Sequence, residues 1–175
     1  LFLAGILFSQ ASTGRAHFCG CPFQGDAVFS GSRFLADAVF QQSVFSRRAA
    51  FSAAHFAGEA NWQAVRFCGE AAFVSCEFQS AARFDSAQFQ GGLDLSGAKI
   101  HTLRLQDASV SGWINLHNTE FLRLEARWPS LSRHLAYDGA AYLALIKNFR
   151  NLEWFEDADD CYYHYRRASQ SARRF

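Results

Sequence analysis

The 175-residue sequence contains no methionine, only two prolines and no long apolar segment. The longest apolar stretch near its start, residues 1–8, is far shorter than the roughly 20 residues of a membrane-spanning helix, and no basic segment precedes it. We therefore expect neither a signal peptide nor a transmembrane span. Because an initiating methionine is absent and Leu1 already falls within a repeat, we expect the chain to be a piece of a longer protein.

An excess of charge of one sign is also missing. The 17 Lys and Arg residues against 16 Asp and Glu residues give a formal net charge of +1, so no field of the whole chain attracts a nucleic acid. The odd number of cysteines, without a CxxC pair or clustered histidines, fits neither a disulfide framework nor a zinc site. Reduced thiols in the cytoplasm are the expectation. The five cysteines are Cys19, Cys21, Cys68, Cys76 and Cys161.

Residues that carry chemistry do not gather in one place. A catalytic site needs a nucleophile beside a base, paired carboxylates or converging metal ligands, and the sequence shows none of these arrangements. The segments that contain glycine, including Gly91 and Gly92, do not match a phosphate-binding loop. We expect no enzymatic activity, no cofactor and no metal site.

Phenylalanine is the abundant residue, with 19 copies, and from Phe23 to Phe89 an aromatic residue recurs at alternating intervals of five and six. A small residue, most often alanine, stands two positions before each aromatic. Because positions i−2 and i share one face of a strand, each unit reads as a short strand followed by a corner. The residues expected in the core are Phe29, Phe34, Phe40, Phe45, Phe51, Phe56, Trp62, Phe67, Phe73, Phe78, Phe84 and Phe89.

Such a unit cannot bury its own apolar side chains, but stacked units enclose them in one continuous core. The pattern continues with aliphatic residues to about position 121, which predicts an all-β solenoid over residues 1–121. Residues 22 apart should then stack at the strand spacing of about 4.8 Å. This register predicts an outward column of Arg33, His55, Glu77 and Lys99.

Successive units such as AVFSG, SRFLAD, AVFQQ and SVFSRR resemble the pentapeptide-repeat family, in a Phe-centred variant of five plus six residues. The resemblance implies a right-handed quadrilateral β-helix with four units in each coil. The number of units predicts about six coils and a rod on the order of 28 Å long.

The sequence changes character after position 121. We interpret residues 122–136 as a cap and linker, and residues 137–175 as a helical hairpin with Asp138 able to cap its first helix and a connection around Glu153. The hairpin should close the open end of the solenoid, whose strand edges would otherwise stay unpaired. Its second helix places Tyr162, Tyr165, Arg166 and Arg167 close together. For these four residues a contact with a partner competes with packing inside the hairpin and with an ordinary solvated helix end.

Several functions remain open at this point. The leading hypothesis is a non-enzymatic protein-interaction scaffold that forms a homo-oligomer through the C-terminal helices, with a protein partner that the sequence does not identify. The segment YLALIKNFRNLEWFEDADDCYYHYRRASQ also resembles the one after the solenoid in pentapeptide-repeat proteins linked to prokaryotic ion-channel-like membrane domains. That resemblance implies a cytoplasmic domain tethered to a membrane segment beyond the chain, with Arg166, Arg167, Arg173 and Arg174 as its basic flank.

Two other roles known for solenoids fit less well. Some pentapeptide-repeat proteins mimic DNA and bind a type II topoisomerase, but that role needs a strongly acidic rod, and residues 1–121 hold nine acidic and eight basic residues. An ice-binding solenoid needs flat arrays of outward threonine, and this chain has only Thr13, Thr102 and Thr119.

Overall fold

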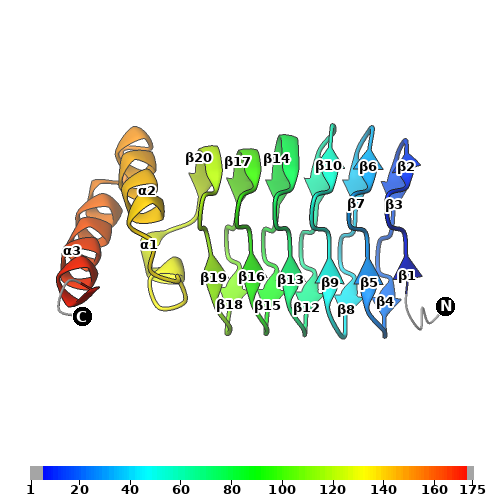
Figure 1. Cartoon of the computed structure of the whole chain (residues 1–175), viewed down its shortest axis with the longest axis horizontal. Coiled ribbons are helices and arrows are strands. Elements are labelled where there is room, and N and C mark those ends of the chain that lie inside the picture. Colours follow the sequence, from blue (N-terminus) through cyan, green and yellow to red (C-terminus); the bar gives the residue numbers. More distant parts are fainter. Residues whose placement is uncertain (1–5, 173–175) are drawn as a thin grey trace.

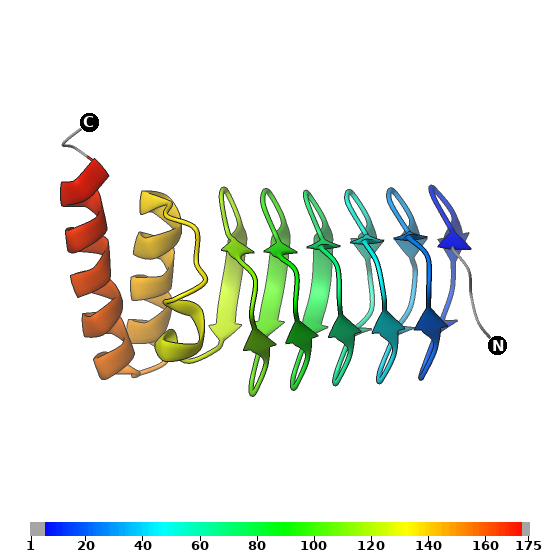
Figure 2. The same ribbon diagram turned by 90° about the horizontal axis from the view of Figure 1, so that it is seen from below.

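A computed structural model describes residues 6–172 of the chain as a rod of stacked coils with helices at one end (Figure 1). The expectations for Leu1, Arg173 and Arg174 concern positions outside the described residues. Each coil has four short sides, as expected for a quadrilateral solenoid, and the coils follow one another along the rod (Figure 2).

Parallel pairing between successive coils forms the faces of the rod. The first face contains β1 (Ile6–Leu7), β5 (Ala27–Val28), β9 (Ala49–Ala50), β13 (Ala71–Ala72), β16 (Leu93–Asp94) and β19 (Ile114–Asn115). A second face contains β4 (Pro22–Phe23), β8 (Val44–Phe45), β12 (Arg66–Phe67), β15 (Gln88–Phe89) and β18 (Ser109–Val110).

The two remaining faces begin as separate strands and fuse along the rod. One starts with β2 (Ser12–Thr13), β6 (Arg33–Phe34) and β10 (His55–Phe56), and the other with β3 (Ala16–His17), β7 (Ala38–Val39) and β11 (Ala60–Asn61). Both then continue in β14 (Glu77–Arg83), β17 (Lys99–Arg104) and β20 (Glu120–Glu125), which run through the corner between them. The described strands complete about five turns, slightly fewer than the six expected.

The predicted register holds through most of the rod. Residues 22 apart pair, as in Arg33↔His55↔Glu77↔Lys99, so the expected outward column is present. In the last turn the interval falls to 21, as in Lys99↔Glu120, because one unit there has five residues in place of six. The shift appears as an irregularity between Phe78 and Ala81.

The repeated aromatic residues form the core. Along one column, the ring of Phe56 stacks at 4.7 Å between centroids on both Phe34 and Phe78, and Trp62 stacks on Phe40 and Phe84 in another column. All 12 residues expected in the core have an exposed fraction of 3% or less. The alanines two positions before them, such as Ala38, Ala60 and Ala82, are fully buried and leave room for the rings.

One class of corner explains the five-residue units. In these units the third residue after the centre donates its backbone N–H to the carbonyl of the centre, as Ser32 does to Phe29 at 3.1 Å. The residue before the donor has a positive φ, 69° at Gly31, which is the geometry of a type II turn. Equivalent corners place alanine in the left-handed region, with φ of 57° at Ala53 and 55° at Ala64.

Strand pairing extends past position 121, because β20 continues to Glu125. Three helices follow: α1 (Trp128–Leu131), α2 (Gly139–Asn151) and α3 (Phe155–Ala172). Asp138 caps α2 by accepting a hydrogen bond from the N–H of Ala141 at 2.9 Å. Glu153, with a φ of 60°, turns the chain between α2 and α3. In both views α2 lies next to the last coil and α3 lies beyond it at the tip of the rod (Figures 1 and 2).

Candidate functional site

Two histidines make polar contacts between the last coil and the segment that follows it. His117 pairs with Asp138, and Nδ1 of His134 lies 2.7 Å from the carbonyl oxygen of Gly112. All five cysteines are free, and burial raises the pKa of the thiols of Cys76 and Cys161 to about 12 each. Within residues 6–172 no three His, Cys, Asp or Glu side chains gather to hold a metal ion.

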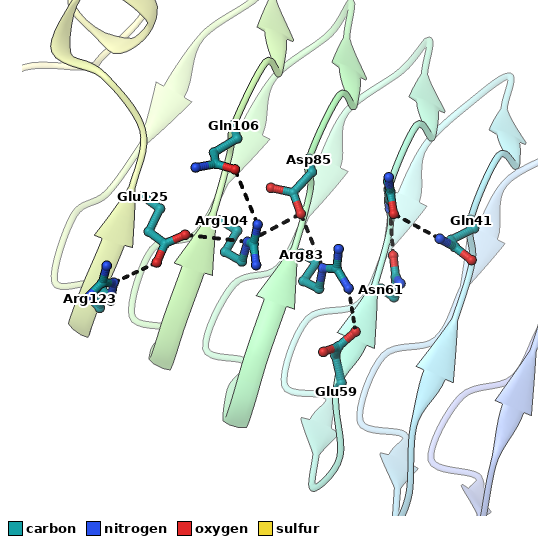
Figure 3. Close-up of polar contacts among 10 residues, drawn as sticks. Gln41, Glu59, Asn61, Arg83, Asp85, Arg104, Gln106, Arg123 and Glu125 are labelled. Atoms are coloured by element: carbon teal, nitrogen blue, oxygen red, sulfur yellow. Dashed lines mark hydrogen bonds and ion pairs between the residues drawn. The ribbon is translucent and has the colours of Figure 1, made fainter.

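A row of ion pairs runs along one side of the rod (Figure 3). We call Glu59, Arg83, Asp85, Arg104 and Glu125 the polar strip. Arg83 contacts Glu59 and Asp85 at 3.2 Å each, and Nε of Arg104 lies 3.4 Å from Asp85 and 3.5 Å from Glu125. Partial burial disfavours the charge of Arg83, but its hydrogen bonds to Glu59 and Asp85 outweigh this effect and raise its pKa.

The polar strip continues as an amide ladder in the earlier coils. Nε2 of Gln41 donates to Oε1 of Gln63 at 3.0 Å, and the backbone N–H of Gln63 donates to Asn61 at 2.9 Å (Figure 3). The register stacks positions 41, 63 and 85 above one another, and the side chains of Gln41 and Gln63 bond across successive coils. Because acids and bases alternate along it, this side of the rod presents no block of one charge.

The helices at the tip are fixed to the solenoid by a charged pair and an aromatic contact. Arg127, directly after the last coil, makes a two-pronged pair with Asp157 of α3, whose side chain is 5% exposed. The guanidinium of Arg127 also lies 5.3 Å from the ring centroid of Trp154. Trp128 is buried against Tyr142 of α2, so the solenoid and the hairpin form one continuous core.

The four residues singled out on the second helix separate into two groups. Tyr165 is half-buried, with its ring 6.2 Å from Tyr142, so it packs within the hairpin. Tyr162, Arg166 and Arg167 are exposed. Arg166 donates to the hydroxyl of Tyr162 at 3.3 Å and lies over its ring.

Two further aromatic residues are exposed on the same helix, and of these only Phe155 was not singled out from the sequence. Phe155 is 62% exposed and Tyr163 is 63% exposed. Helical spacing could have predicted this group from the sequence. Tyr162 and Tyr163 follow Phe155 by seven and eight residues, which places them on the same side of the helix as Phe155. We call Phe155, Asp159, Tyr162, Tyr163 and Arg166 the outer face of α3.

A sequence model of pentapeptide repeats matches residues 18–66 and 63–109, which together span just over half of the 175 residues. The chain belongs to the pentapeptide-repeat family. No significant match was found among curated proteins or among solved structures. Membership of the pentapeptide-repeat family fits the observed solenoid and identifies the chain as a repeat scaffold.

The pentapeptide-repeat match ends at residue 109 and so does not extend over the C-terminal helices. The resemblance of those helices to segments linked to ion-channel-like domains therefore stays a prediction. None of the helices described by the structure has the length and apolar character that a membrane crossing requires.

Proposed function

We propose that this pentapeptide-repeat protein is a rigid, non-enzymatic scaffold that pairs with a second copy of itself through the outer face of α3. The observation that carries the proposal is the exposure of Phe155, Tyr162 and Tyr163 on α3, the helix that lies at the tip of the rod (Figure 2). Grouped aromatic residues on one surface favour a protein contact, because burying them removes a large apolar area from water.

The charges of α3 favour a second copy as the partner. Its first turns carry Glu156, Asp159 and Asp160, whereas Arg166 and Arg167 stand near its C-terminal end. Two such helices packed antiparallel about a two-fold axis near Tyr162 and Tyr163 would bring Asp159 of each copy opposite Arg166 of the other. Such an interface is self-complementary, as two-fold symmetry requires.

Light scattering after size-exclusion chromatography tests the proposal. The unmodified chain should elute as a dimer, and Tyr163→Glu should elute as a monomer because two buried carboxylates would meet at the axis. Leu35→Glu is the matched control, since Leu35 is 56% exposed on the solenoid, far from α3, and should stay dimeric. A monomeric unmodified chain at high concentration would disprove the proposal.

We further propose that the protein is cytoplasmic and continues into a membrane segment. The support is the resemblance of the C-terminal helices together with the exposed Arg166 and Arg167 near the end of α3, which suit the cytoplasmic flank of such a segment. Translation of the gene beyond Phe175 tests this, because about 20 apolar residues should follow soon after it. A stop codon at that point would contradict the tether and leave the scaffold unaffected.

The alternative of a DNA mimic that binds a topoisomerase finds no support in the arrangement of charge. Along the polar strip, Glu59, Asp85 and Glu125 each contact an arginine, so their negative charge is neutralised where they stand. A mimic of the DNA backbone needs rows of unpaired acidic groups.

A further inference from the structure

The cap covers the last coil unevenly. The edge of β19 is paired by the linker, because Ile114 donates to the carbonyl of His134 at 2.7 Å and Ala136 donates back to Ile114 at 2.8 Å. The second half of β20 is paired by a side chain of α2. The amide of Asn148 accepts from the N–H of Leu124 and donates to its carbonyl, both at 2.9 Å, as a neighbouring strand would.

The first half of β20 has no such cover among the described residues. In earlier coils the equivalent carbonyls accept from the next strand, as Phe34 accepts from Ala57 and Ala98 accepts from Glu120, both at 2.9 Å. By register, the next acceptors in this series are the carbonyls of Thr119 and Phe121. Among the described strands β20 pairs only with β17, so these two carbonyls lie on an open edge.

A cleft of about 790 Å³ reaches this edge and is lined by residues of β14, β17, β20 and α2. Thr119, Glu120, Phe121 and Leu122 line one side, and Lys147 belongs to the helical side. Phe121 is half-buried, whereas Leu124 on the covered half of the same strand is fully buried. Phe121 pairs with Ile100 and is the last centre of this column among the described residues, so the register would place the next apolar side chain beside it.

We propose that this cleft binds an extended segment of a partner protein, which adds one parallel strand to β20 and carries a basic residue followed by two bulky apolar residues. The first apolar side chain would stack on Phe121, as successive centres do along the rod. The N–H groups of the basic residue and of the second apolar residue would donate to the carbonyls of Thr119 and Phe121. Main-chain bonds of this kind supply affinity, and the alternating side chains supply specificity.

Charge and exposure decide which side chains fit. The basic residue would lie over Glu120 and continue a column in which Glu77, Lys99 and Glu120 already alternate in sign. The second apolar residue would cover Leu122, which is 76% exposed. Lys147 on the opposite side is exposed and disfavours a segment with several basic residues.

The chain itself provides a probe with this pattern. Residues 32–37, Ser-Arg-Phe-Leu-Ala-Asp, occupy the equivalent side of an earlier coil. A capped synthetic peptide of this sequence, titrated into the full chain and followed by amide NMR shifts, should perturb residues 119–122 together with Lys147 and Asn151. The same peptide methylated on the leucine nitrogen, which removes the N–H aimed at Phe121, should bind at least about tenfold more weakly.

A charge exchange tests the side-chain part of the proposal. Replacing the peptide arginine by glutamate should weaken binding, and Glu120→Lys in the protein should reverse the preference between the two peptides. Equal binding of the methylated and unmethylated peptides would overturn the proposal, and so would shifts confined to other surfaces or no binding at about 5 mM peptide.

The experiments can disprove this proposal and the proposed self-association through α3 independently of each other. Tyr163→Glu should bind the peptide as the unmodified chain does, because Tyr163 does not line the cleft. Unfolding curves of Glu120→Lys should match those of the unmodified chain, since Glu120 is exposed.

Discussion

Phenylalanine suits the inward positions of this rod because its ring stacking matches the spacing of the backbone. Strands in successive coils lie about 4.8 Å apart, and the rings of Phe34, Phe56 and Phe78 stack with centroids 4.7 Å apart. Backbone pairing therefore places each ring at a favourable stacking distance from the ring in the next coil. Each stacked pair adds about 0.5–1.5 kcal/mol beyond the burial of apolar area.

Truncation of one such ring should be costly. We expect Phe56→Ala to lower the free energy of unfolding by about 3–5 kcal/mol, because it removes a buried ring and leaves a cavity between two others. Chemical denaturation measures the loss, and Phe56→Leu, which keeps most of the volume, should lose less. A loss below about 1 kcal/mol in the alanine variant would contradict the role of Phe56 in the core.

Glycine is needed where two coils touch at a corner. A Cβ atom on Gly69 would lie 2.6 Å from the carbonyl carbon of Arg47, which belongs to the backbone of the preceding coil. Gly69→Ala should therefore force the coils apart and destabilise the protein by about 1–3 kcal/mol. Gly14→Ala is the control, because a Cβ there meets nothing within 4 Å. Equal thermal melting of the two variants would argue against close corner contact.

The backbone conformation at the corners was less predictable from the sequence than the aromatic core. Aromatic spacing could be read directly from the sequence, since each ring occupies one predictable position. The positive φ of Ala53 and Ala64 could not, because alanine carries no preference for the left-handed region. Pairing with the neighbouring coils holds these residues in the left-handed region, which alanine does not favour by itself.

At the scale of elements, Asn148 connects a helix to a sheet. Both polar atoms of its amide bond to Leu124, and both residues are buried. Asn148→Leu would leave the N–H and carbonyl of Leu124 buried without partners, so we expect a loss of about 2–4 kcal/mol in unfolding free energy. Asn151→Leu, at an exposed position one turn later, should change stability little. A small effect of Asn148→Leu in denaturation would indicate that water replaces the amide.

Asp138 links the start of α2 to the last coil, and this link should depend on pH. The N–H of Ala141 and the ring of His117 both bond to its carboxylate and hold the pKa of Asp138 below its ordinary value. A lowered pKa in the folded state stabilises the protein above the unfolded pKa of about 3.9, and the gain disappears as the pH falls through the folded pKa.

Replacing the N-cap residue Asp138 by an uncharged residue that can also cap α2 separates the effect of its charge from that of its hydrogen bond. Asp138→Asn can still accept the bond from Ala141 but has no charge to lose. The stability that Asp138 adds relative to Asp138→Asn should therefore shrink as the pH falls below about 4. Urea unfolding at several pH values measures it. A difference that grows in acid would contradict the assigned shift.

The element boundaries were only partly predictable. Helical spacing and the capping residue Asp138 located α2, because both signals are local. The continuation of β20 to Glu125 was missed, since its pairing with β17 depends on a residue interval that shortens by one in that turn. The Asn148 contact joins residues 24 apart, and no local pattern in the sequence predicts it.

At the scale of the whole molecule, the two ends of the rod differ. Among residues 6–172, the strands β1 to β4 pair only with the coil that follows them, whereas the last turn also meets the linker and α2 on its other side. Strands with one neighbour open at lower cost than strands with two.

Amide hydrogen exchange should record this difference. We expect β1 to β4 to exchange first, β20 to be better protected near Leu124 than near Phe121, and the central strands β9 to β12 to exchange last. The expectation follows from the number of backbone neighbours of each strand. Mass spectrometry of peptide fragments would measure the order, and uniform exchange along the rod would show that it opens as a single unit.

The 22-residue register of the central coils also bears on how such a chain changes over evolutionary time. A 22-residue segment cut from these coils restores the same corner, the same inward rings and the same outward column when it is copied in tandem. Unequal recombination of a gene could therefore lengthen the rod by one coil, about 4.8 Å, without rotating the faces that flank the insertion. Recombination of this kind would change the distance between the two ends of the rod in steps of one coil. The orientation of each face would stay the same.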